Sequence, residues 1–214
     1  MAAFGLIMTA IVSPAADIPI TYLPYTITAP GTYVLAQDLT YSDPNTPAIS
    51  IETPDPQVGA IVIDLRGHTL SGFTTQSNTT GILDDVSFGR GPTTIKNGAI
   101  QNYTTLVLVQ NGAYDPLDPV GVVLDHLTFN DAALHDPNVG EAVGFGRMNN
   151  STVRDCAFTS CHYGIYDADS GGGNRYVNNT FSDCSVTIQV NLYGPVTGVI
   201  KDCVFAPYVP QQAP

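Results

Sequence analysis

The chain has 214 residues, of which 43% are hydrophobic and 12% are charged, a composition that excludes a disordered protein. It contains 20 glycines and 16 prolines, and its β-branched and aromatic residues lie in short runs between turn-forming residues, which predicts an all-β domain. The formal net charge is −12 with only seven Lys and Arg, so the chain lacks the basic footprint that nucleic acids and anionic membranes require.

The first 20 residues form an apolar N-terminal segment. Residues 4–12 are mostly apolar, and small residues follow at Ser13, Ala15 and Ala16. This order is similar to the h-region and cleavage site of a secretory signal, although no positive residue precedes it. The alternative is an apolar cap over the open end of the fold. The stretch is too short to span a bilayer, so we predict no transmembrane segment.

One six-residue unit recurs through the rest of the chain. Each copy begins and ends with an apolar residue and carries a turn-forming residue between them. The copies are LRGHTL (65–70), IKNGAI (95–100), LDHLTF (124–129), VRDCAF (153–158), YVNNTF (176–181) and IKDCVF (200–205). They end 23 to 30 residues apart, a period typical of stacked repeat proteins. In a stack of parallel strands, the first and last positions of the unit become two columns of core side chains.

A second apolar strand follows most copies of the unit. Examples are residues 81–85, 106–109, 142–145, 164–167 and 187–190. Because no stretch of useful length has helical periodicity, connections through helices are excluded. We therefore predict an all-β fold, a single-stranded right-handed parallel β-helix solenoid of about six or seven coils. It spans residues 21–208, and residues 209–214 form a C-terminal tail.

Four segments share this pattern of core and turn residues. They are ITAPGTYVLAQDLTY (27–41), IVIDLRGHTLSGF (61–73), TTIKNGAIQNY (93–103) and GVVLDHLTF (121–129). These segments resemble the opening coils of bacterial right-handed parallel β-helix repeat proteins, a group within the pectate-lyase-like superfamily. The resemblance implies the fold over roughly residues 27–205. That superfamily includes lyases, glycoside hydrolases, tailspikes and adhesins, so the resemblance does not select an activity.

The four cysteines fall in two columns of the repeat, two cysteines in each. Cys161 and Cys184 each lie three residues past the end of the unit in neighbouring coils, close enough for a disulfide bond. The alternative is a column of buried thiols that fill a tight space. Cys156 and Cys203 share another column but lie two coils apart, which is too far for a bridge.

The second position of the unit points outward and holds most of the basic residues. The sequence alignment places Arg66, Lys96, Asp125, Arg154, Val177 and Lys201 in this column. The functional interpretation is a groove in which Arg66, Lys96, Arg154 and Lys201 bind an acidic sugar, and Arg154, Asp155, Asp125 and His126 are the catalytic candidates for a lyase. The alternative interpretation is a solvated face on which alternating charges relieve repulsion.

Carboxylates provide two further hypotheses. A glycosidase needs two carboxylates about 5–9.5 Å apart, and Asp84, Asp85, Asp167 and Asp169 lie near predicted strand ends. The alternative is that these are turn-forming residues. Asp115 and Asp118 lie in a proline-rich loop and could bind Ca²⁺, without the spacing of an EF-hand.

Three functional hypotheses follow from the sequence. The first is a non-catalytic structural, adhesive or glycan-binding module, favoured by the short solenoid and by the lack of a compact catalytic motif. The second is a polysaccharide lyase or glycoside hydrolase that acts on the outer face. The third is a filament or tailspike-like subunit, a homo-oligomer formed by end-to-end stacking. We expect a secreted or cell-surface protein whose partners are polysaccharide or like subunits.

Overall fold

The computed structural model describes residues 16–52, 59–73, 78–86, 91–111, 121–132, 140–170, 172–192 and 198–207. All regular elements in these ranges are β-strands, and paired strands run parallel to each other, so the all-β prediction is confirmed. Within the same ranges we find no helix with the length and hydrophobicity needed to cross a bilayer. Residues 1–15 and 208–214, which contain most of the predicted N-terminal segment and the whole predicted tail, lie outside the described residues.

The strands form three columns, which the chain visits in a fixed order. The first column contains β1 (Ile18–Ile20), β3 (Gly31–Leu35), β6 (Ile61–Asp64), β9 (Thr93–Gln101), β11 (Val122–Asn130), β13 (Thr152–Arg154), β16 (Arg175–Val177) and β19 (Val199–Lys201). The second contains β4 (Leu39–Thr40), β7 (Thr69–Ser71), the later halves of β9 and β11, β14 (Ala157–Thr159), β17 (Thr180–Ser182) and β20 (Val204–Phe205). The third contains β2 (Tyr25–Ile27), β5 (Ile49–Ile51), β8 (Thr80–Val86), β10 (Thr105–Asn111), β12 (Glu141–Gly146), β15 (Tyr163–Ser170) and β18 (Val186–Leu192).

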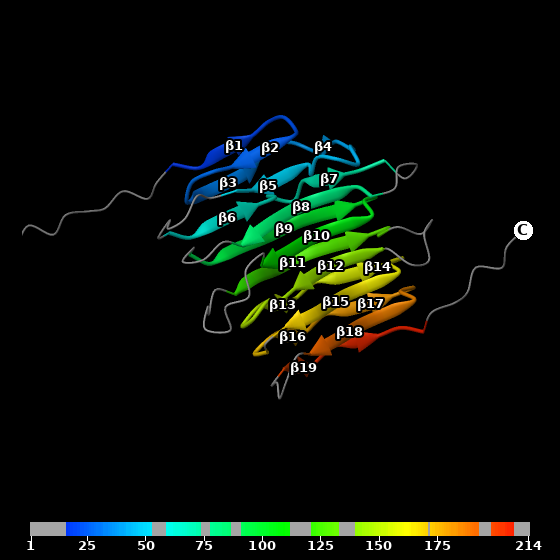
Figure 1. The fold of residues 1–214 in the computed structure, drawn as a ribbon. Helices are drawn as coiled ribbons and strands as arrows, with labels where there is room; N and C mark the ends of the chain where they lie inside the picture. Colours follow the sequence, from blue (N-terminus) through cyan, green and yellow to red (C-terminus); the bar gives the residue numbers. More distant parts are fainter. Residues whose placement is uncertain are drawn as a thin grey trace, which may run out of the picture.

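The first two columns belong to one 13-stranded sheet and the third forms a 7-stranded sheet. Figure 1 shows the strands stacked in sequence order, from β1 at one end to β19 at the other. We call one pass through the three columns a level. Between β3 and β18, six levels carry a strand in every column, with partial levels at both ends of the described chain. This repeating parallel arrangement fits a β-solenoid.

The turns between columns are made by residues in the left-handed backbone region. Between the first two columns, Asn97, His126, Asp155, Asn178 and Asp202 have φ of 52° to 59°. The turn between the second and third columns uses the same backbone conformation. Its left-handed residues are Asn102, Asp131, Ser160 and Asp183, with φ of 53° to 63°. Asn and Asp tolerate this region better than other residues with a Cβ, which explains their recurrence at the third position of the unit.

The predicted register is wrong in the first copy of the unit. Ile63, instead of Leu65, pairs with Ile95, whereas Leu70 pairs with Ile100 as predicted. Four residues, 65–68, therefore fill a turn for which the next level uses only Asn97 and Gly98. The two extra residues are accommodated in the interior, because Leu65 is fully buried. It lies so close to Gly98 that a Cβ at position 98 would collide with it.

The core is built from columns of like side chains. The last position of the unit pairs as predicted at every level from Leu70 to Phe205. Phe129, Phe158, Phe181 and Phe205 stack ring on ring with centroid separations of 4.9, 4.6 and 5.3 Å. The predicted second strands are confirmed as β8, β10, β12, β15 and β18. The sequence repeat therefore corresponds to the spatial repeat.

Candidate functional site

The outward second column carries charges that alternate in sign over four successive levels. Because of the register change, Asp64 takes the place predicted for Arg66, and the column reads Asp64, Lys96, Asp125, Arg154, Val177 and Lys201. We call these residues the charge ladder. Lys96 Nζ lies 3.5 Å from Asp64, and Arg154 Nη2 lies 2.7 Å from Asp125. The ladder therefore couples acids and bases of neighbouring levels.

Each of the four basic residues predicted to bind substrate has an acidic partner. Besides the two ladder pairs, Arg66 forms an ion pair with Asp17, and Lys201 lies 3.6 Å from Asp202. The pairs of Arg66 and Lys201 are exposed at the surface, so each contributes at most about 1 kcal/mol to stability, whereas Asp64 and Asp125 in the ladder pairs are more than 80% covered. The main effect of the four pairs is to neutralise the positive stripe that an acidic polysaccharide would need. This arrangement is the one expected of the solvated-face alternative.

Four of the predicted catalytic residues do come together. His126 Nδ1 lies 2.7 Å from Asp125 Oδ1, while the other oxygen of Asp125 accepts from Arg154. Asp155 stands at the next turn and accepts a hydrogen bond from Asn178. Burial opposes ionisation of Asp125, but the bonds from Arg154 and His126 outweigh it and hold its pKa below the usual value. The same bond raises the pKa of Arg154, so the guanidinium cannot act as a base.

This polar cluster has two chemical capacities. His126 is exposed and its ring is held by a carboxylate, an arrangement that suits proton transfer at the other ring nitrogen. Asp125, His126 and Asp155 also each offer a ligand atom within 4.8 Å of the others. Bonds from Arg154 and Asn178 already occupy one oxygen of each of the two carboxylates, and the nearby guanidinium charge opposes binding of a cation. The predicted calcium ligands Asp115 and Asp118 lie outside the described residues.

Among the predicted candidates whose side chains the structure describes, no two carboxylates take up the arrangement of a glycosidase pair. Asp84 and Asp167 lie inside strands β8 and β15 and face the core, at 0% and 1% exposure, so the turn interpretation is wrong for both. Three steps of the parallel register separate them, about 14 Å at the usual strand spacing. Asp85 is exposed on the opposite face, and the side chain of Asp169 lies outside the described set.

Cys161 and Cys184 stack in neighbouring levels as predicted. Both are buried, and the Cys161 thiol is in hydrogen-bond contact with Cys184. This contact and burial raise the pKa of Cys161. All four cysteines are free thiols in this structure, so the predicted bridge is not formed. Burial also raises the pKa of Cys156 to about 12, which makes it an inert, structural thiol.

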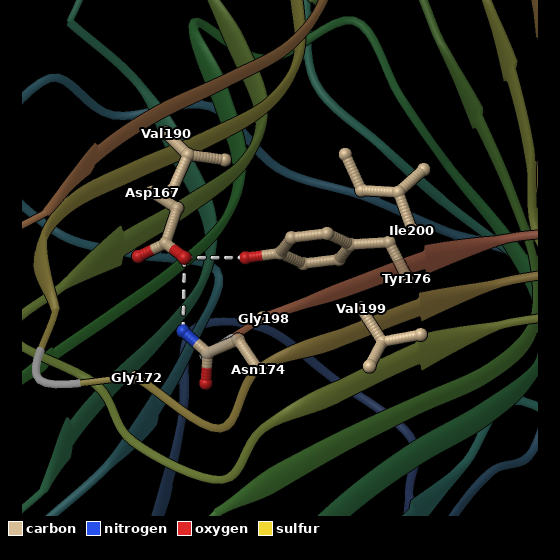
Figure 2. A pocket seen from close by; sticks show the side chains of 8 residues that line it. All are labelled: Asp167, Gly172, Asn174, Tyr176, Val190, Gly198, Val199 and Ile200. Carbon is tan, nitrogen blue, oxygen red and sulfur yellow. Dashed lines mark hydrogen bonds between the residues drawn. The ribbon is translucent and has the colours of Figure 1, made fainter. Parts of the chain in front are cut away.

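A pocket of about 210 Å³, which the sequence did not predict, lies at the end of the stack beside β19. Figure 2 shows the carboxylate of Asp167 at its floor, receiving hydrogen bonds from Tyr176 Oη and Asn174 Nδ2. Burial and the Asp167 charge raise the pKa of Tyr176, so the phenol stays protonated as a donor. Val199 and Ile200 form an apolar wall. The sequence signal was the strand alternation of β15, which places Asp167 on the same side as Ile165.

The same end of the molecule carries most of the large exposed apolar side chains in the described chain. They are Val190, Val199, Ile200, Val204 and Phe205, with exposures of 36% to 61%. At the opposite end, Ile18 and Tyr22 are exposed, and Phe73 is exposed at the side of the stack. We call Val190, Ile200 and Phe205, which continue inward-facing columns, the terminal apolar face.

No family model, curated protein or solved structure matches the chain.

Proposed function

We propose that this chain is a single-stranded right-handed parallel β-helix similar to the pectate-lyase-like proteins, and that it is a non-catalytic structural or adhesive module. The handedness is supported by a general rule, since parallel strands of one sheet are almost always connected by right-handed crossovers. The signal-like segment before residue 20 supports a secreted or surface location. Fractionation of expressing cells tests that location.

The pairing of the outward charges carries the functional part of the proposal. A polysaccharide enzyme of the predicted kind needs cations free to bind the substrate carboxylates and a base free to take a proton. Here each basic side chain that was predicted to bind substrate forms an ion pair with an aspartate, and Arg154 is held in its charged form. Large apolar side chains gather at one end instead, a feature that favours contact with macromolecules over chemistry.

A second candidate function is supported by the polar cluster. His126, held by Asp125 and next to Arg154, is the one described imidazole placed for proton transfer beside a guanidinium. In a lyase, His126 would take the proton next to a uronate carboxylate, and a released Arg154 would neutralise that carboxylate. The structural alternative is that the cluster only ties neighbouring levels together.

One experiment separates the two functions. The purified chain is incubated with neutral, uronic and amino-sugar polymers, and unsaturated products and new reducing ends are measured, with a glycan array in parallel. We expect no turnover with any polymer. Turnover that is lost in His126→Gln and Arg154→Ala, but kept in the exposed control Arg175→Ala, would replace the structural proposal with the lyase.

A further inference from the structure

The last level of the described stack presents a strand edge that is open to pairing. The register ends at β19, and no described strand pairs with its outer side. The Val199 N–H donates to the Asn174 carbonyl at 3.0 Å, and the Lys201 carbonyl accepts from the Asn178 N–H at 2.9 Å. The backbone polar groups of Val199 and Lys201 therefore face β16. Since successive strand residues point their polar groups to opposite sides, the N–H and C=O of Ile200 face away from the stack.

The side chains of this level repeat the interior of the molecule. Ile200 and Phe205 continue columns that are buried at every preceding level from Ile63 and Leu70 onward, yet here they are 54% and 50% exposed. The phenylalanine stack ends on Phe205, and the pocket above Asp167 opens beside Ile200. Another level placed on this face would bury the same kind of surface that holds the inner levels together.

The opposite end is less suited to pairing. Ala36 donates to the carbonyl of Ile20, so Ile20 faces β3 and the neighbouring Pro19 faces outward. A proline has no N–H to donate, and proline on an edge strand is a common means of blocking pairing. Head-to-tail stacking would have to use this edge. A contact between the β19 ends of two copies does not involve the proline-blocked edge of β1.

The open end is also complementary to itself. When two such ends meet around a two-fold axis beside Ile200, β19 runs antiparallel to its counterpart, and Lys201 lies across from Val199 of the other copy. Each strand then supplies the outward polar groups of Ile200 to its partner.

We propose that two copies of this chain dock tail to tail, through the terminal apolar face and the outer edge of β19, to form a closed two-fold dimer. The proposal rests on the structural role argued above and names its partner, a second copy of the chain. A tail-to-tail contact uses the same surface twice, so it closes at two copies. A head-to-tail contact would instead grow into a filament.

The first test is the mass of the full chain in solution, measured by sedimentation velocity at physiological salt. We expect twice 22.6 kDa for the unaltered chain. Ile200→Pro removes the outward N–H and no hydrogen bond between described residues, and Phe205→Glu charges the apolar face. Both variants should sediment at 22.6 kDa, whereas Tyr22→Glu, at the other end, should stay dimeric. Circular dichroism confirms that each variant is folded.

The second test is the geometry of the contact. The chain has only two lysines, Lys96 and Lys201, so an amine cross-linker applied to a mixture of isotopically light and heavy chains gives a simple result. Tail-to-tail docking predicts intermolecular links between two Lys201 side chains. Species larger than a dimer, or a dimer that Tyr22→Glu abolishes, would overturn the proposal. So would a full chain that stays monomeric while a chain without residues 209–214 dimerises, because the tail would then be the occupant.

The outcomes also separate this inference from the proposed function. A monomeric chain without turnover on any polymer overturns the dimer and leaves the structural role in place. A dimeric chain that cleaves a polymer overturns the structural role and leaves the dimer.

Discussion

Polar side chains inside the stack replace hydrogen bonds that the regular strands do not provide. Asn179 is fully buried, accepts from the Cys156 N–H at 3.0 Å and donates to the Val153 carbonyl at 2.9 Å. Asn174 works in the same way beside Asp167, accepting from the Ser151 N–H at 2.8 Å. Both asparagines lie where a turn interrupts the strand ladder, so each satisfies backbone groups that would otherwise be buried without partners.

The substitution Asn179→Ala should reveal this role. It removes one acceptor and one donor and leaves two buried backbone groups unsatisfied, so we expect a loss of about 2–4 kcal/mol in the free energy of unfolding. Urea denaturation measures the loss. Asn191→Ala, at an exposed amide that reaches Tyr166, is the matched control and should change stability by less than about 0.5 kcal/mol. Equal effects of the two substitutions would contradict the assigned role.

Glu141 makes stability depend on pH. Burial raises its pKa, and no ion pair among the described residues includes it. Because the folded pKa lies above the unfolded one, the contribution of Glu141 is most favourable below the unfolded pKa and is lost as pH rises through the folded pKa. Glu141→Gln keeps the shape of the neutral acid, so it should raise the melting temperature at pH 7 and have little effect at pH 4.

The difference in melting temperature between Glu141→Gln and the unaltered chain is recorded from pH 4 to pH 8. The chain's other glutamate, Glu52, is exposed, and Glu52→Gln is the control. A benefit of Glu141→Gln that is greatest at pH 4 would show that the sign is wrong.

At the scale of elements, short strands are stabilised by the columns they build together. Many strands are only three residues long, such as β13 and β16, too short for independent stability. Their side chains, however, meet equivalent side chains above and below, most clearly in the phenylalanine stack. A substitution in one column therefore changes the side-chain packing of the levels above and below it as well as its own.

Removing a ring from the middle of the phenylalanine stack should be costly. Phe158 is fully buried between Phe129 and Phe181, so Phe158→Ala is expected to lower the free energy of unfolding by about 3–5 kcal/mol. Phe205→Ala removes a half-exposed ring at the end of the same stack, so its cost should be less than half as large in the monomer. Chemical denaturation of both variants at low concentration provides the comparison. Similar losses would contradict the argument from burial.

At the scale of the whole molecule, the dominant electrostatic term is repulsion. The net charge is −12, and the ladder pairs neutralise only the few basic residues. Added NaCl shortens the screening distance from about 30 Å at 0.01 M to about 8 Å at 0.15 M. We expect the urea midpoint to rise over this range, because general repulsion is screened more than the exposed pairs are weakened. A falling midpoint would mean that the ion pairs outweigh the repulsion.

Much of the candidate site was accessible from the sequence, and the gaps have identifiable causes. The repeat correctly placed Asp125, His126, Arg154 and Asp155 together, because every copy after the first has the same number of residues in its turn. Arg66 was misplaced because two extra residues entered the turn of the first copy. The sequence leaves Asp167 between a carboxylate pair and a turn because Asp is common in turns, whereas in the structure it is paired inside the core with Tyr176.

The six-residue repeat by itself determined the all-β class, the stacking of the levels, the phenylalanine column and the outward position of the charges, because each depends on residue type and spacing along the chain. Only the tertiary structure decided which charges meet, which aspartates are buried and which end of the stack is open. Those features depend on register between strands that lie 23 or more residues apart, where one insertion changes every neighbour. They also depend on the absence of a further described level beyond β19, which leaves Ile200 and Phe205 exposed although their residue types are those of the core.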